Sequence, residues 1–322
     1  MSVLIEKSGV LSTIQDLGRT GFRRFGINPN GAMDKATGRL INILLGNDEA
    51  EAVLEIHYPA PILKFEEPAI IALGGADFGA TLDRILIENW RPVFVRENQT
   101  LKFTGKVSGN RAYLAIKGGF AINEWLGSTS TNLAAKIGGY GGRSLTKGDQ
   151  LNLKHPAKGD ERRTNYKISK NIIPSYSSFP TLRVIAGAEF EKLTPLSEQN
   201  FSKQNFTLGN NSNRMGFRLQ GEPLSLIDET ELVSSAVDFG TIQLLPDGQL
   251  IILMADHQTT GGYPRIAHVA SADLPVLAQL GAMDRINFQV ISPVEAERLT
   301  LDFEKDLNLL RIGVNSKYEF ER

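Results

Sequence analysis

Short apolar segments alternate with turn residues along much of the chain. These segments are rich in β-branched and aromatic residues and recur at close intervals. We expect strands at residues 53–56, 62–65, 69–73, 82–87, 93–95, 100–103 and 111–117, and a second set that starts at 182–187 and includes 250–253. Such spacing favours an antiparallel sandwich or barrel over alternating strand and helix units. The chain is therefore predicted to be mainly β.

Apolar positions follow helical spacing in only a few places. Residues 33–45 are expected as a helix, and Asp34 would lie in its first turn, where a carboxylate complements the helix dipole. Further patterns predict a short helix at 273–280 and another at 293–310, the latter begun by a capping box. Helices are thus a minor part of the predicted fold.

A polar, Ser-rich stretch interrupts the strand pattern near the middle of the chain. We interpret residues 157–178 as a linker between an N-terminal domain, 1–156, and a C-terminal domain, 179–322. A chain of 322 residues is long enough to bury two cores. Residues 146–151 and 281–286 echo each other faintly, because each contains a Gly turn, an Asp and the start of a final strand. A duplicated β-barrel is the predicted architecture.

The densest group of reactive side chains follows the predicted strand at 250–253. Its polar members include Asp256, Gln258, Thr259, Thr260 and Tyr263. A hairpin whose Asp and Thr side chains bond their own turn is the simpler explanation for an isolated segment of this kind. A ligand site is the alternative, because acidic, amide and hydroxyl groups converge beside a Gly-Gly pair.

Two other loops have the composition of binding loops. The first carries Gln15, Asp16 and Arg19. The second, residues 136–144, is the most Gly-rich segment and contains Arg143, so its backbone N–H groups could cradle an anion. It lacks the Walker spacing, and a bare Gly-rich loop is more often a tight crossing between strands.

The candidate site residues fall into three chemical classes. Arginines can bind carboxylate or phosphate through paired hydrogen bonds, but they can also bridge structural carboxylates. Aspartates can orient a nucleophile, bind Mg on a nucleotide or cap turns, and glutamine amides can hold the carbonyl and N–H of a lactam. We assign catalysis to Asp256, Gln258 and Asp16. The residues expected to bind substrate or cofactor are Gln15, Arg19, Asp34, Asn132, Arg143, Arg214, Gln243, Thr259, Thr260 and Tyr263.

Composition argues against several classes of partner and catalyst. A net charge of −1 gives no electrostatic footprint for nucleic acid or an anionic membrane, and no segment approaches ~18 consecutive apolar residues. The absence of Cys excludes thiolate chemistry and fits a cytoplasmic protein. The four His are dispersed, so no metal site is expected. No serine elbow occurs, and no Met has a Lys neighbour, so we expect neither a serine hydrolase nor covalent biotin.

Several motifs together resemble one family, the C subunit of 5-oxoprolinase, which also goes under biotin-dependent carboxyltransferase domain, the second subunit of allophanate hydrolase and antagonist of a sporulation kinase inhibitor. The motifs are TIQDLGR (13–19), GAMD (31–34), ALGGADF (72–78), GSTST (127–131), RMG (214–216), DHQTTGGYP (256–264) and ADLP (272–275). The resemblance covers nearly the whole chain and implies two tandem cyclophilin-like β-barrel domains.

The resemblance also implies a function. It is that of one subunit of an ATP-dependent 5-oxoprolinase, which opens the lactam of 5-oxo-L-proline to L-glutamate with a companion subunit of related sequence and a separate hydrolytic subunit. ATP with Mg would serve the complex, held by this chain or by its partner. One alternative is a biotin-dependent carboxyltransferase component acting on urea or a related amide. Another is a regulatory protein that binds and antagonises a kinase inhibitor.

Overall fold

A computed structural model describes residues 2–155, 165–228 and 232–320. Contacts divide the chain into two compact units, each assembled from separate segments. Unit 1 contains Met1–Arg19, Asn30–Pro174 and Glu304–Arg322, and unit 2 contains Thr20–Pro29 and Ser175–Phe303. The predicted linker, 157–178, lies partly outside the described residues, and the predicted domain boundaries stay a prediction.

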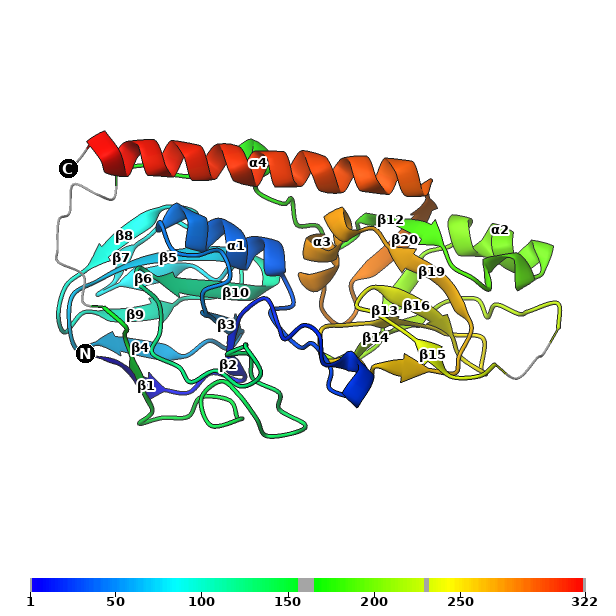
Figure 1. The fold of residues 1–322 in the computed structure, drawn as a ribbon, viewed down its shortest axis with the longest axis horizontal. Coiled ribbons are helices and arrows are strands. Elements are labelled where there is room, and N and C mark those ends of the chain that lie inside the picture. Colours follow the sequence, from blue (N-terminus) through cyan, green and yellow to red (C-terminus); the bar gives the residue numbers. More distant parts are fainter. Residues whose placement is uncertain (1, 156–164, 229–231, 321–322) are drawn as a thin grey trace. The chain divides into compact units, whose positions relative to one another are not determined.

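Unit 1 is built on two antiparallel sheets around one core (Figure 1). The first has the order β11 (Gln150–Asn152), β1 (Ser2–Lys7), β4 (Ile62–Phe65), β9 (Thr100–Phe103), β6 (Ala80–Leu82) and β7 (Ile85–Leu86). The second has the order β2 (Ser12–Gln15), β3 (Val53–His57), β10 (Ser108–Ile116), β5 (Ala69–Asp77) and β8 (Pro92–Val95). The single strand expected at 82–87 is wrong, because Asp83 and Arg84 adopt positive φ and turn the chain between β6 and β7.

Helix α1 (Lys35–Leu44) packs on the second sheet, against β5 and β10 (Figure 1). Asp34 caps it, accepting hydrogen bonds from the Thr37 N–H (2.9 Å) and hydroxyl (2.7 Å). The helix approaches β5 so closely that a Cβ on Gly74 would lie 2.7 Å from Ile41. Asp34 is therefore the N-cap residue that precedes the helix and does not lie in its first turn, and its role in ligand binding stays a prediction.

Unit 2 contains a closed β-barrel. Its strands follow the order β12 (Thr181–Ala186), β19 (Arg265–Val269), β16 (Thr241–Leu244), β17 (Leu250–Leu253), β14 (Gly216–Gln220), β13 (Phe206–Leu208) and β20 (Arg285–Val290). Parallel pairing of β12 with β20 closes it. Helix α2 (Pro195–Lys203) contributes Phe201, whose ring stacks on Phe288 at 4.8 Å. The prediction of a mainly β fold with a barrel is confirmed.

Smaller elements complete unit 2. The pair β15 (Ser235–Ala236) and β18 (Thr260–Gly261) forms a short ribbon, and α3 (Leu274–Ala278) is shorter than the helix expected at 273–280. Helix α4 (Pro293–Phe320) is longer than the expected 293–310 and runs on into the terminal segment of unit 1. No candidate membrane-spanning helix is found in the described part of the chain.

Candidate functional site

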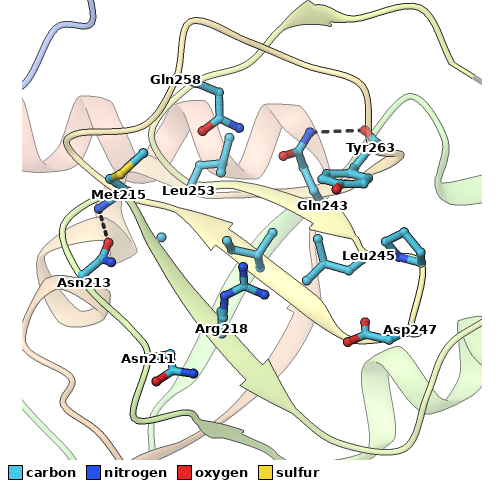
Figure 2. Close-up of a pocket in the computed structure, with 13 residues that line it drawn as sticks. Asn211, Asn213, Met215, Arg218, Gln243, Leu245, Asp247, Leu253, Gln258 and Tyr263 are labelled. Carbon is cyan, nitrogen blue, oxygen red and sulfur yellow. Dashed lines mark hydrogen bonds between the residues drawn. The ribbon is translucent and has the colours of Figure 1, made fainter. Parts of the chain in front are cut away.

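A groove on the outer face of the unit 2 barrel holds the most distinctive arrangement of polar groups. It encloses about 520 Å³ over strands β14, β17 and β16, beside the loop that follows β17 (Figure 2). Its lining comprises Asn211, Asn213, Met215, Gly216, Arg218, Gln243, Leu245, Pro246, Asp247, Ile251, Leu253, Gln258 and Tyr263. This groove is large enough for a small organic molecule.

Strand register explains why these side chains meet. Arg218 pairs with Ile251, and Ile251 pairs with Gln243, so the three residues form one row across adjacent strands. Successive strand residues point to opposite faces, and Phe217 and Ile252 occupy the barrel core. The row therefore faces outward, with Ile251 as an apolar floor between the Arg218 guanidinium and the Gln243 amide.

The amide of Gln243 is fully buried, and only its nitrogen has a hydrogen-bond partner among the described residues. Its Nε2 donates to the Tyr263 carbonyl at 3.2 Å, while its Oε1 has no hydrogen-bond partner among the described residues. The Tyr263 carbonyl fixes this orientation, because a flipped amide would set oxygen against oxygen. Gly261 lets the covering loop approach, since a Cβ there would lie 2.7 Å from Nε2. A buried acceptor without a partner among the described residues thus borders the groove.

Arg218 supplies the positive charge. Its side chain is exposed, and within the described part of the chain no carboxylate pairs with its guanidinium. The acidic lining residue Asp247 caps its own turn by accepting a hydrogen bond from the Gln249 N–H at 3.0 Å. The groove therefore offers a cation and a polar acceptor to a ligand, and its chemistry is that of binding and orientation.

The predicted catalytic residue Asp256 lies at the base of the loop and pairs with Arg214. Arg214 Nε is 2.9 Å and Nη2 is 3.1 Å from the two carboxylate oxygens. The side chains are only 7% and 12% exposed, and the Asp256 N–H also donates to the Arg214 carbonyl. Asn28 donates to the Asp256 carbonyl at 3.1 Å. Two predicted site residues thus bind each other and fix the loop.

The rest of this loop is positioned by its surroundings. Gln258 is exposed and lines the groove, the Thr259 carbonyl accepts from the Val237 N–H, and Thr260 pairs with Ala236 in the short ribbon. Of the predicted residues, Gln243, Gln258 and Tyr263 therefore line one groove, whereas Thr259 and Thr260 form its backbone support.

A histidine pair packs behind the loop. His257 is buried, with Nε2 3.6 Å from an Asp238 oxygen, and Arg23 lies 3.1 Å from the same carboxylate. The contacts with His257, the Phe239 N–H and Arg23 hold the pKa of Asp238 well below its usual range. Burial lowers the pKa of His268. The described residues contain no group of three potential His, Asp or Glu metal ligands.

Asp16 in unit 1 is tied to one turn. One carboxylate oxygen accepts from the Gly18 N–H (2.7 Å) and the hydroxyls of Ser128 (2.7 Å) and Ser130, and the other accepts from the N–H (2.6 Å) and hydroxyl (3.1 Å) of Thr129. These contacts use both oxygens for structure. They leave Asp16 as an anchor for the 128–130 segment.

Three other predicted residues surround the same segment. Arg19, 1% exposed, donates to Asn30 at 2.8 Å and to the Ser130 carbonyl, and Asn132 also donates to Asn30, at 3.1 Å. Gln15 donates to Thr13 and to the Thr131 carbonyl, and its Oε1 lacks a partner among the described residues. The structure brings Gln15, Asp16, Arg19 and Asn132 together in unit 1.

Arg143 ends the Gly-rich loop but does not offer its charge there. Its guanidinium makes two hydrogen bonds to Asp149, at 2.6 and 2.8 Å, and stacks on Tyr140. The hydrogen bond from Arg143 is the main cause that lowers the pKa of Asp149. This pair holds the turn that leads into β11.

Sequence patterns missed the groove residues Arg218, Asn211 and Asn213. A signal was present, because the alternation of GFRLQ at 216–220 places Arg218 on the face opposite Phe217 and Leu219. The pairing of that strand with β17 was not visible, so the neighbours of Arg218 could not be named.

The chain matches the model of a known family, described as carboxyltransferase domain, subdomain A and B, over residues 25–290. The chain belongs to the carboxyltransferase domain family. Within this family it is 40% identical to the 5-oxoprolinase C subunit of Haemophilus influenzae, covering 95% of this chain and 96% of that protein. It is 36% identical to the 5-oxoprolinase C subunit of Escherichia coli, covering 94% and 95%. The resemblance to that subunit is confirmed.

A solved structure shares the fold of this carboxyltransferase domain. Urea amidolyase from K. lactis superposes with a TM-score of 0.90 at 28% identity, covering 96% of this chain. This chain spans only 20% of that protein. The family thus includes both separate subunits of this length and domains inside much larger enzymes.

Proposed function

We propose that this chain is a subunit of an ATP-dependent 5-oxoprolinase complex that opens 5-oxo-L-proline to L-glutamate. The observation that carries the proposal is its 40% identity to the C subunit of a 5-oxoprolinase over 96% of that protein. The groove supports it, because the buried Gln243 amide and the Arg218 guanidinium suit a small polar ring.

The chemistry explains why a complex and ATP are needed. An unactivated lactam is a poor electrophile, so transfer of the γ-phosphoryl group to its carbonyl oxygen, with release of ADP, prepares the carbon for attack by water. Cleavage of the C–N bond and loss of phosphate then give glutamate, and ATP and water are consumed. In this scheme the residues of the groove bind and orient the lactam.

We propose that the nucleotide serves the complex, with its main contacts outside this chain. Arg143, the cation predicted for the Gly-rich loop, is paired with Asp149 and does not offer an unpaired charge to a phosphate. We propose that the companion subunit of related sequence supplies the main contacts to ATP with Mg, that a separate hydrolytic subunit completes ring opening, and that the complex works in the cytoplasm.

Reconstitution tests this function directly. Release of glutamate from 5-oxoproline and ATP is measured with the partner subunits, in the presence and absence of this chain. We expect turnover only in its presence, and little from this chain alone. Turnover that does not depend on this chain would contradict the proposed function.

A second function is favoured by the similarity to urea amidolyase, with its TM-score of 0.90. In that case the chain would accept a carboxyl group from a biotin carried by a partner and transfer it to urea or a related amide. Two assays distinguish carboxyl transfer from ring opening. One incubates the chain with a biotin carboxylase, a biotinylated carrier, bicarbonate, ATP and urea, and the other is the reconstituted assay with 5-oxoproline and ATP. Urea-dependent ADP release would favour carboxyl transfer, and 5-oxoproline-dependent glutamate release would favour ring opening.

A further inference from the structure

We propose that Arg218 and Gln243 select a carboxylated cyclic amide over a neutral amide such as urea. Arg218 binds the carboxylate of the ligand, and Gln243 Oε1 accepts the hydrogen bond of the ring N–H, with the ring lying on Ile251. This inference rests on the proposed function and adds to it the residues that determine specificity.

Arg218 differs from the other arginines considered as site residues in how its guanidinium is bonded. Arg19, Arg143 and Arg214 all donate to protein oxygens. Arg218 lies in a groove, and the part of the chain that the structure describes provides no carboxylate for it. A guanidinium recognises a carboxylate through paired hydrogen bonds, so an anionic ligand would complete this site.

The buried Gln243 side chain has a carbonyl oxygen without a hydrogen-bond partner among the described residues. A side chain that is 0% exposed normally has its oxygen hydrogen-bonded, but Oε1 has no such partner among the described residues. Its Nε2 is held by Tyr263, so the oxygen cannot turn away without losing that bond. A ligand N–H is the complementary group, and an amide ring provides one.

The spacing of the two residues suits one ligand. They lie on β14 and β16, on either side of β17, so their backbones are roughly 10 Å apart, twice the ~4.8 Å strand spacing. Arg218 and Gln243 both line the groove, and the long Arg218 side chain reduces the gap that a ligand must span (Figure 2). Leu245 and Leu253 border the floor, and their apolar surface suits ring carbons.

Charge in the groove sets the expected orientation. Asp247 is the acidic residue of the lining and would repel a carboxylate, whereas Arg218 attracts it. The anionic end of the ligand is therefore placed at Arg218. Urea has no carboxylate, so it can accept only a neutral hydrogen bond from Arg218 and gains less there than an anionic ligand.

Matched ligands and variants test the carboxylate contact in the reconstituted complex. Calorimetric titration without ATP compares 5-oxoproline with 2-pyrrolidinone, which lacks only the carboxylate. We expect Arg218→Gln to weaken 5-oxoproline binding roughly tenfold to hundredfold, to leave 2-pyrrolidinone unchanged, and Arg218→Lys to recover part of the loss. Arg298→Gln, which removes the same charge from exposed helix α4, is the control and should change neither.

The amide contact has its own ligand pair. The lactone 5-oxotetrahydrofuran-2-carboxylate replaces the ring N–H with oxygen, so the wild-type complex should bind it more weakly than 5-oxoproline, and Gln243→Met should remove that preference. Equal binding of 5-oxoproline by wild type and Arg218→Gln, an equal loss of both amides, or no binding to the wild-type complex would overturn the inference.

These outcomes are separable from failure of the proposed function. If 5-oxoproline binding depends on Arg218 but no turnover occurs in the presence of ATP, the proposed 5-oxoprolinase function is contradicted. The role of Arg218 in recognising the carboxylate is then still supported. If turnover occurs and its KM for 5-oxoproline is unaffected by Arg218→Gln, the proposed function is supported. Recognition of the carboxylate by Arg218 is then contradicted.

Discussion

Asp16 in unit 1 and Gln243 in unit 2 are both buried polar residues that the sequence identifies as candidate site residues. They differ in how fully the protein satisfies their hydrogen-bonding groups. In unit 1 both oxygens of Asp16 accept hydrogen bonds from one turn. In unit 2 the Gln243 oxygen lies unpartnered among the described residues, beside a groove. A reactive residue type becomes a candidate ligand contact only when the protein leaves its hydrogen-bonding capacity unused.

The arginines repeat this difference. Arg214 gives its guanidinium to Asp256, and Arg143 gives its own to Asp149. Arg218 has no such carboxylate within the described residues and sits where a ligand could reach it. Arg214 and Arg143, which lie in distinctive motifs, thus stabilise the fold. Arg218 lies in a strand without a distinctive motif, and its guanidinium is available to a ligand.

Replacement of Asp16 should have the largest effect. Asp16→Ala leaves the hydroxyls and N–H groups of residues 128–130 without their acceptor, so we expect a loss of about 4 kcal/mol in the free energy of unfolding. Chemical denaturation measures it. The matched variant Gln243→Met should change stability by less than about 1 kcal/mol, since it removes one hydrogen bond together with an unsatisfied oxygen. Equal losses of stability would contradict a structural role for Asp16 that Gln243 does not share.

Replacement of Asp256 comes next. Asp256→Ala leaves a largely buried Arg214 without its carboxylate, and removal of one partner from such a pair costs about 3 kcal/mol. The denaturation midpoint should fall, and activity should fall with it as the loop loosens. If Asp256→Ala keeps wild-type stability and loses only turnover, Asp256 is a catalytic residue and its structural assignment here is wrong.

A smaller effect is expected at Gly261. A Cβ at this position would lie 2.7 Å from Gln243 Nε2, so Gly261→Ala should cost about 2 kcal/mol and displace the amide from the groove. Binding of 5-oxoproline, measured by titration, should weaken. Gly313→Ala is the control, since a Cβ there meets nothing within 4 Å. Unchanged binding in Gly261→Ala would show that the position of Gln243 does not matter.

The smallest effect belongs to Arg143. Its side chain is 46% exposed, so Arg143→Ala should cost less than about 1 kcal/mol. Arg143 lowers the pKa of folded Asp149, so the stabilisation is present above the unfolded value of about 3.9 and is lost as pH falls through the folded pKa. Thermal melts of both proteins should differ at neutral pH and converge once the pH falls below the lowered pKa of folded Asp149. A difference that grows in acid would contradict this assignment.

Local pattern predicted much of the fold. The strands at 62–65, 100–103 and 250–253 have the expected bounds, because apolar runs between turn residues determine them locally. The strand expected at 82–87 failed because two turn residues broke it. Helix α4 exceeds its prediction because the part beyond residue 310 makes distant contacts, such as Arg311 with Glu49 and Lys317 with Tyr166.

The candidate site was only partly predictable, because its decisive contacts are long-range. Gln243, Gln258 and Tyr263 were identified from residue type, but the pairing of Arg214 with Asp256 joins residues 42 positions apart. Arg23 reaches Asp238 across 215 positions, so its segment joins unit 2 although it precedes most of unit 1. Register and pairing of this kind arise from the folded chain.

Binding of 5-oxoproline in the groove can be followed at Ile251, which forms the groove floor, during titration. With only the isoleucine methyl groups of this chain labelled in the reconstituted complex, NMR spectra are recorded as 5-oxoproline is added. We predict that the Ile251 methyl resonance shifts progressively to saturation, while that of Ile56 in the core of unit 1 stays in place. An Ile251 resonance that does not move at concentrations that support turnover would contradict binding in this groove.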